Sequence, residues 1–191
     1  YYTTLELNKF LERLSAECSN EKSKQMALSI EPSSDYQTVL DELQKTSQAF
    51  ELSVKFGTPS FMNFKDVCPS LRRASSGGIL SLREMLNILQ LLQQIASLCD
   101  WYKHCEGMET DLDYLFSRLM DNKYLRDRLE NSILTEDELS DSASPTLASI
   151  RRKIAKAGIN LRSSLDKMIR SESVQKCLQD SIVTIRDGRF V

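Results

Sequence analysis

The sequence predicts a mainly α-helical protein with a multi-helix core, a long lever-like C-terminal helix and a short terminal β-hairpin segment. Hydrophobic residues make up 41% and charged residues 27% of the 191 positions, as in an ordinary globular protein. With only 6 glycines and 4 prolines the chain has few breaks, which favours long helices over turn-rich sheets. Apolar residues recur at helical spacing along most of the chain, often just after a capping pattern.

Two helices are expected near the N-terminus. Thr3-x-x-Glu6 has the form of a capping box, and the helix that it opens is expected to end near Ser19–Asn20. A short second helix is expected to stop before Pro32. The apolar positions of the first helix are Leu7, Phe10, Leu11, Leu14 and Cys18, and those of the second are Met26, Ala27 and Ile30.

A long helix is expected next. Ser34-x-x-Gln37 is a second capping-box pattern, and Gly57 stands where a C-cap is expected. The apolar spacing predicts an inward-facing side made of Tyr36, Val39, Leu40, Leu43, Ser47, Phe50 and Val54.

An irregular connector over residues 58–80 separates this helix from the next long one. It is expected to contain one short helix through Val67, Leu71 and Ala74. Ser81-x-x-Glu84 is a third capping-box pattern, where regular structure resumes. One face of the helix that follows is lined by Leu82, Met85, Leu89, Leu92, Ala96 and Cys99.

Two shorter helices are expected at Leu112–Met120 and Tyr124–Ile133, followed by an acidic polar link from Thr135 to Ser144. The carboxylates of this link could bind a cation, although a solvated acidic loop is the favoured interpretation. They belong to Glu136, Asp137, Glu138 and Asp141.

The best-marked helix begins at Pro145, which occupies the first helical position after the expected N-cap, Ser144. Its apolar residues form a narrow stripe with heptad-like spacing and one four-residue insertion, which is typical of a helix that packs along one seam. A surface helix of a bundle is slightly favoured over a free coiled coil. The stripe consists of Leu147, Ile150, Ile154, Ala157, Leu161, Leu165 and Met168.

The last ten residues, 182–191, change to a β-type pattern. Asp187-Gly188 is a preferred pair for a two-residue type I′ turn, but only three residues remain for the return strand. The chain also starts at Tyr1 without Met. We therefore expect it to be a piece of a longer protein, whose function need not lie within it.

The composition argues against several kinds of chemistry. The most apolar stretch, residues 79–102, is interrupted by charged and amide side chains, so it predicts an amphipathic helix and no membrane association. The 5 cysteines are scattered and the single histidine has no CxxC pair nearby, which predicts reduced thiols and no metal site. Phosphate-loop, G-x-S-x-G and deaminase motifs are missing from the sequence. We expect a cytoplasmic chain without catalytic residues, metal or cofactor of its own.

The formal net charge of −2 conceals an uneven distribution. Residues 1–103 carry 11 basic and 12 acidic groups, residues 104–144 carry 4 and 11, and residues 145–191 carry 10 and 4. A helix with this basic bias, leading into a basic hairpin, could follow a phosphate backbone. The candidate nucleic-acid-binding residues are Arg151, Arg152, Lys153, Lys156, Arg162, Lys167 and Arg170 in the helix, and Arg186 and Arg189 in the hairpin.

Charge alone supports a second interpretation equally well. The basic helix could pair with the acidic region 104–144 or simply be solvated, and the chain would then be a structural scaffold for interaction or dimerisation without nucleic-acid contact. An aromatic platform for single strands is not expected, since Phe190 is the only aromatic residue after Tyr124.

Several segments, in the same order along essentially the whole chain, carry a family resemblance. They are Leu5–Phe10 (LELNKF), Met26–Ser33 (MALSIEPS), Asp66–Ala74 (DVCPSLRRA), Gly78–Ser81 (GILS), Asp141–Ser144 (DSAS) with Leu147 and Ile150-Arg151, and, most specific, Ile182–Val191 (IVTIRDGRFV). Together they resemble the second class of bacterial MutS-like proteins, the MutS-two family.

The resemblance implies a division into three parts. Residues 1–143 would be the first half of a helical MutS-type core, residues 144–170 the outgoing lever helix, and residues 171–191 the start of a clamp or core β segment. Proteins of this family lack a mismatch-reading domain, continue into a DNA-embracing clamp and an ABC-type ATPase, and often end in a small nuclease-like domain.

The resemblance also implies a function for the whole protein: a homodimer that binds branched DNA, such as recombination junctions, and suppresses recombination. A role on stalled ribosomes is attributed to some members. ATP and Mg²⁺, and any nuclease activity, would belong to parts of the protein beyond Val191.

Overall fold

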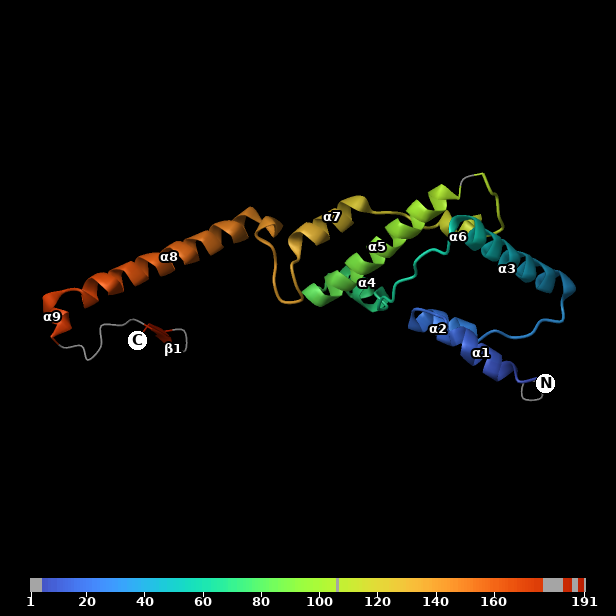
Figure 1. The fold of residues 1–191 in the computed structure, drawn as a ribbon, viewed down its shortest axis with the longest axis horizontal. Coiled ribbons are helices and arrows are strands. Elements are labelled where there is room, and N and C mark those ends of the chain that lie inside the picture. Colours follow the sequence, from blue (N-terminus) through green and yellow to red (C-terminus); the bar gives the residue numbers. More distant parts are fainter. Residues whose placement is uncertain (1–4, 106, 177–183, 187–188, 191) are drawn as a thin grey trace. The chain divides into compact units, whose positions relative to one another are not determined.

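The protein is described by a computed structural model that covers residues 5–105, 107–176, 184–186 and 189–190. It divides into two compact units, Tyr1–Leu139 and Ser140–Val191 (Figure 1). Helices account for most of the described residues, so the prediction of a mainly α-helical chain is confirmed. The finer division at residues 143 and 170 stays a prediction.

Helices α1 (Leu7–Ala16) and α2 (Glu21–Leu28) pack against each other. Glu6 occupies the N-cap of α1 in the left-handed region, with φ of 53°, and its carboxylate binds the Lys9 ammonium at 2.6 Å. The predicted capping box, which needs Glu6 inside the helix, is therefore wrong. α1 also ends earlier than predicted, and Asn20 instead caps α2 by accepting the Ser23 amide hydrogen at 3.0 Å.

Helix α3 (Tyr36–Phe56) begins at a different cap from the predicted one. The Asp35 carboxylate, not the Ser34 hydroxyl, accepts the Thr38 amide hydrogen, at 2.9 Å, so the capping box proposed at Ser34 is wrong. The predicted end is confirmed: Gly57 follows Phe56 with φ of 81°, a conformation that glycine adopts without steric cost.

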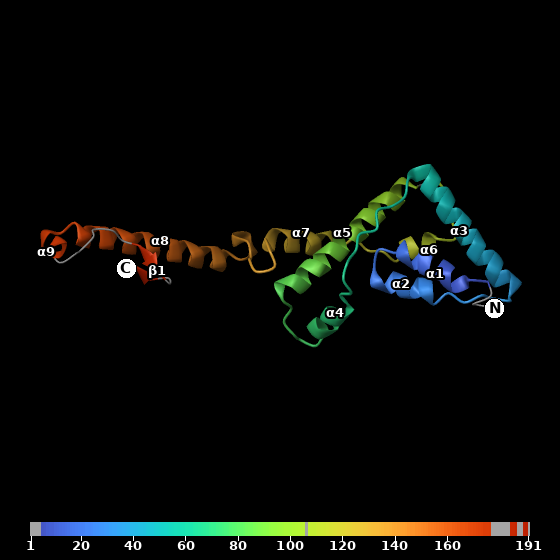
Figure 2. The same ribbon diagram turned by 60° about the horizontal axis from the view of Figure 1, so that its bottom comes forward.

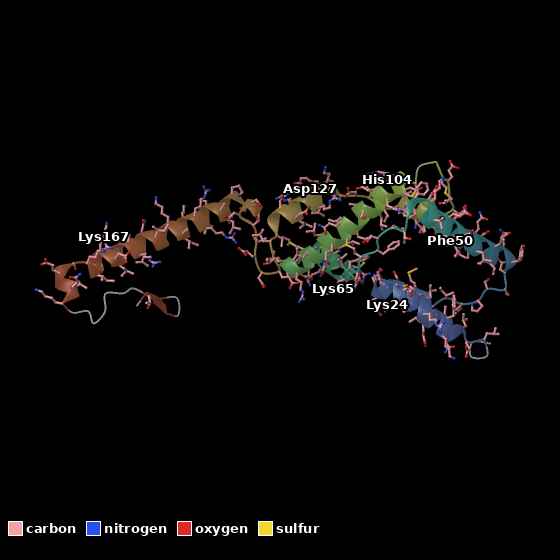
Figure 3. The ribbon with its side chains drawn as sticks, in the orientation of Figure 1. Lys24, Phe50, Lys65, His104, Asp127 and Lys167 are labelled. Atoms are coloured by element: carbon pink, nitrogen blue, oxygen red, sulfur yellow. The ribbon has the colours of Figure 1, made fainter. Side chains whose placement is uncertain are left out.

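The side of α3 that packs inward is opposite to the predicted one. Leu52 is 2% exposed, whereas Leu43 and Phe50, which were expected inside, are 62% and 71% exposed. Figure 3 labels Phe50 on α3. The inward side is held by Gln48, whose Oε1 accepts the Asp111 amide hydrogen at 2.9 Å. We call the exposed row the α3 stripe: Tyr36, Val39, Leu40, Leu43, Phe50 and Val54.

Helix α4 (Cys68–Ser75) is the short helix expected in the connector, and a loop joins it to α5 (Leu82–His104), as Figure 2 shows. The capping box at Ser81 and Glu84 is confirmed. The Glu84 carboxylate also accepts a hydrogen bond from the Ser70 hydroxyl at 2.8 Å and pairs with the Arg73 guanidinium, which ties α4 to the start of α5.

These bonds lower the pKa of Glu84 from its usual value near 4.5 to about 2, chiefly through the Ser81 amide and then the Ser70 hydroxyl. A depressed carboxyl pKa stabilises the fold above the unfolded pKa, and the stabilisation is lost as the pH falls through the folded value. We expect the stability advantage of the wild type over Glu84→Gln to be constant at neutral pH and to shrink between about pH 4.5 and pH 2. Urea unfolding at several pH values measures this, and a difference that does not change with pH would contradict it.

The connector is fastened to α5 by side chains that α5 directs toward it. Gln94, 3% exposed, accepts the Met62 amide hydrogen at 2.7 Å through Oε1 and donates to the Ser60 carbonyl at 2.6 Å through Nε2. Two turns further along α5, the Trp101 indole donates to the Gly57 carbonyl at 2.9 Å. An irregular segment is thus held in one path by side-chain bonds to its backbone.

Two shorter elements complete the first unit. α6 (Asp113–Phe116) is a single turn, shorter than the predicted Leu112–Met120, and it is held by stacking of Phe116 on Tyr102 with ring centroids 4.4 Å apart. α7 (Lys123–Ser132) lies beside α5 and matches its prediction to within one residue (Figure 1). The buried apolar residues among those described are few: Leu11, Ala27, Leu52, Val67, Leu89, Ala96, Cys105 and Ile133.

The second unit is built around one long helix. A short 3₁₀ turn, η1 (Asp141–Ala143), leads into α8 (Pro145–Ile169), and α9 (Glu172–Gln175) follows, which the sequence did not predict. β1 (Ile185–Arg186) pairs antiparallel with β2 (Arg189–Phe190), with Ile185 opposite Phe190 and Arg186 opposite Arg189. The turn residues Asp187 and Gly188 lie outside the described residues, so the type I′ hairpin turn stays a prediction.

Candidate nucleic-acid interface

α8 begins and ends close to where the sequence predicts. Ser144 is the N-cap, in an extended conformation, and Pro145 occupies the first turn, where a backbone N–H has no helical partner. Arg170 caps the C-terminus, and its amide donates to the Asp166 carbonyl at 3.2 Å. The helix has 25 residues and is therefore about 37 Å long.

Seven of the nine predicted site residues lie on α8 or at its C-cap, and six of these seven are exposed. Arg151, which is half-buried, pairs with Asp141 of η1 at 2.6 Å. Arg152 donates from Nε to the Ala148 carbonyl one turn earlier, at 3.2 Å. Among the described residues, no carboxylate pairs with the other five, Lys153, Lys156, Arg162, Lys167 and Arg170 (Figure 3 labels Lys167).

The remaining two candidates, Arg186 and Arg189, lie on β1 and β2 as backbone partners of one another. The structure therefore brings these two together and keeps the seven helical residues on a single element.

The predicted apolar stripe of α8 is present but uncovered. No residue of α8 is buried, and the exposed fractions of Ile154 and Met168 are 65% and 60%. The second unit thus consists of a helix that presents both apolar and basic side chains to its surroundings.

The acidic link shows no arrangement suited to a metal ion. Glu136 pairs with Arg83 at 3.4 Å and Asp141 with Arg151 at 2.6 Å, so two of its carboxylates already have cationic partners. Over the described part of the chain, His, Cys, Asp and Glu side chains form no group of three that could hold a metal ion.

His104 and Cys105, neighbours in sequence, are each bonded to their own helical turn. His104 Nδ1 lies 2.6 Å from the Asp100 carbonyl, and the Cys105 thiol donates to the Trp101 carbonyl at 3.5 Å. Burial raises the pKa of the Cys105 thiol, which disfavours the nucleophilic thiolate.

The sequence did not predict one cluster of polar side chains. Lys22 Nζ lies 3.1 Å from the Asp66 carboxylate and 3.7 Å from Cys68 Sγ, beside an open cavity of about 350 Å³. The Cys68 amide and thiol, followed by the Lys22 ammonium, lower the pKa of Asp66 to about 2. No local motif signals this cluster, because Lys22 and Cys68 are 46 positions apart.

No described helix is both long enough and apolar enough to cross a lipid bilayer.

The chain was compared with known proteins. It is 36% identical over 191 residues to a protein of Acetivibrio thermocellus named Endonuclease MutS2, in an alignment that covers 98% of this chain. Proteins of the same name from Ruminiclostridium cellulolyticum and Pelotomaculum thermopropionicum are 32% and 33% identical, over 100% and 98% of the chain. The chain belongs to the MutS2 family. The resemblance noted in the sequence is thereby confirmed.

The match to MutS2 covers only part of those relatives. The chain spans 24% of the length of each of the three. No family model matches the chain.

Proposed function

We propose that α8 contacts DNA in a MutS2 protein that binds branched DNA and suppresses homologous recombination. The observation that carries the proposal is the set of exposed cations along α8, five of which have no carboxylate partner among the described residues. Such side chains bind phosphates and release the counterions condensed on DNA. We further propose that the whole protein is a homodimer, and that ATP, Mg²⁺ and the nuclease activity named in its relatives belong to parts outside this chain.

Binding of the full-length protein to a labelled four-way junction, a linear duplex of equal length and purified ribosomes tests this function. We expect the junction to bind more tightly than the duplex, and its affinity to fall steeply between 50 and 300 mM KCl, because phosphate contacts dominate. Affinity that is indifferent to salt would contradict the proposal. Tighter binding of ribosomes than of either DNA would transfer the function to ribosomal RNA.

A second candidate function is a structural scaffold, in which the helices position distant domains and hold a dimer without touching nucleic acid. The pairs Arg151–Asp141 and Arg83–Glu136 favour it, since they join basic side chains to the acidic region. This function predicts weak binding to any nucleic acid together with lower stability when Glu136 and Asp141 are replaced by Gln and Asn. The proposed DNA contact predicts the reverse, because exposed pairs of this kind contribute only about 0–1 kcal/mol to stability.

A further inference from the structure

We propose that α8 binds the double-stranded arms of its nucleic acid through one face only. This basic face consists of Arg152, Lys153, Lys156, Lys167 and Arg170, and it leaves out Arg151 and Arg162. The inference rests on the proposed function and narrows it to a defined surface and a defined form of nucleic acid.

Helical geometry separates the seven cations into two groups. Successive residues of an α-helix are rotated by about 100°, so with Leu147 at zero the five residues of the basic face fall between about 140° and 240°. By the same measure Arg151 and Arg162 fall near 40° and 60°. Arg151 is also engaged by Asp141 at 2.6 Å. The two groups thus differ both in direction and, for Arg151, in an existing partner.

The apolar stripe lies on the other side of the helix from the basic face. Its residues fall between about 280° and 360° on the same wheel, centred roughly 130° from the middle of the basic face. A helix that packs along the apolar stripe would therefore leave Arg152, Lys156, Lys167 and Arg170, at least about 120° from the centre of the stripe, in solvent. Such a helix would come equally near Arg151 and Lys153, which lie about 80° from the centre on opposite borders of the stripe.

Within the basic face the cations form two clusters. Lys156 and Lys167 are eleven residues apart, which corresponds to about 16 Å along the helix axis. The positions between them on this face are taken by the polar residues Asn160 and Ser163, while Ser164 and the exposed Ile159 lie about 20° outside its two edges. Because none of these side chains is charged, a phosphate backbone could cross between the clusters without meeting an acidic group. Asp166, the acid of α8, falls at the margin of the face.

The residues of the face indicate which form of nucleic acid fits. α8 contains no aromatic residue, so it offers no surface on which unpaired bases could stack. Lys and Arg side chains alone contact phosphates, which fix position without reading sequence. A face of Lys and Arg side chains therefore fits a double-stranded nucleic acid that is bound through its phosphate backbone.

The test uses the full-length protein with the five residues of the basic face changed to Gln, and a 30-base-pair duplex followed by fluorescence anisotropy from 50 to 300 mM KCl. If each cation neutralises one phosphate, the log–log slope of affinity against salt becomes shallower by about 4.5, since one contact to duplex DNA contributes about 0.9. The partial variants R152Q/K153Q/K156Q and K167Q/R170Q are expected to lose about 2.7 and 1.8 of that slope. Far-UV circular dichroism confirms that each variant is folded.

R151Q/R162Q removes two cations of α8 outside the basic face, and a loss of slope as large as that of K167Q/R170Q would overturn the restriction to one face. The matched control is K65Q/K123Q, which removes two exposed cations outside α8 and is expected to leave the slope unchanged. If the wild type binds with a steep slope and the five-residue variant keeps it, the inference is overturned while the proposed function stands. Tighter binding of oligo(dT) than of the duplex overturns the assignment to double strands. Failure of the wild type to bind any nucleic acid overturns the proposed function and this inference together.

Discussion

Replacing Leu52 with alanine is expected to lower the free energy of unfolding by about 2–5 kcal/mol. Leu52 is 2% exposed and is the one residue of α3 that is fully buried. Truncating its side chain removes apolar contacts and leaves a cavity that the surrounding helices fill only in part. Urea unfolding of the 191-residue chain, followed by circular dichroism at 222 nm, measures the loss.

Leu43→Ala is the matched control, with the same substitution on the same helix. Leu43 is 62% exposed, so its replacement is expected to change the free energy of unfolding by no more than about 0.5 kcal/mol. Equal losses at the two positions would mean that the α3 stripe is covered, and that the inward side assigned to α3 is wrong.

Gln94→Leu is the other substitution with a large expected effect. Leucine is similar in size to glutamine but can neither accept the Met62 amide hydrogen nor donate to the Ser60 carbonyl. A hydrogen bond contributes about 0.5–1.5 kcal/mol net, and the freed backbone groups of Ser60 and Met62 belong to exposed residues that can bond to water. The loss of both bonds is therefore expected to lower the free energy of unfolding by about 1–3 kcal/mol.

Two measurements separate this effect from a general loss of packing. The Met62 amide is expected to lose its protection against hydrogen exchange in Gln94→Leu, while amides in the middle of α5 keep theirs. Gln90→Leu, at an exposed position of the same helix, is the control and is expected to shift stability by no more than about 0.5 kcal/mol. Retained protection at Met62 would show that other groups hold the connector.

Local signals in the sequence located most of the helices. The Ser81 capping box, the glycine after α3 and the proline at the start of α8 all act within a few residues, and the structure places a helix end at each. The caps of α1 and α3 were misassigned because Glu6 competes with Thr3, three positions away, and Asp35 with the adjacent Ser34 for the same role. A capping pattern locates the start of a helix to within a few residues. Which of those residues becomes the N-cap depends on the path of the preceding backbone.

The face of α3 could not be predicted in the same way. Periodicity shows which apolar residues share a side of a helix, but it does not say what covers that side. A row of six large apolar residues suggested the core, yet the unit packs against Leu52 and the amide of Gln48 on the other side. Contacts between residues far apart in sequence determine which side of α3 packs inward.

The candidate site likewise has features that the sequence predicts and features that only the structure shows. The charge asymmetry of residues 145–191 was visible in the sequence, and the separation of the basic face from Arg151 and Arg162 follows from helical geometry once the helix bounds are known. The pairing of Arg151 with Asp141 depends on the turn at η1 and needed the structure. So did the cluster of Lys22, Asp66 and Cys68, which is assembled from two distant segments.

The hydrogen bond from Trp101 to the Gly57 carbonyl gives the protein an internal optical reporter. Trp101 is the single tryptophan of the chain, and its indole joins α5 to the residue that ends α3. An event that detaches α3 from α5 breaks this bond and exposes the half-buried indole further to water, so its emission is expected to move to longer wavelength without an added label. Separation of one helix from the unit can therefore be followed apart from unfolding of the whole chain.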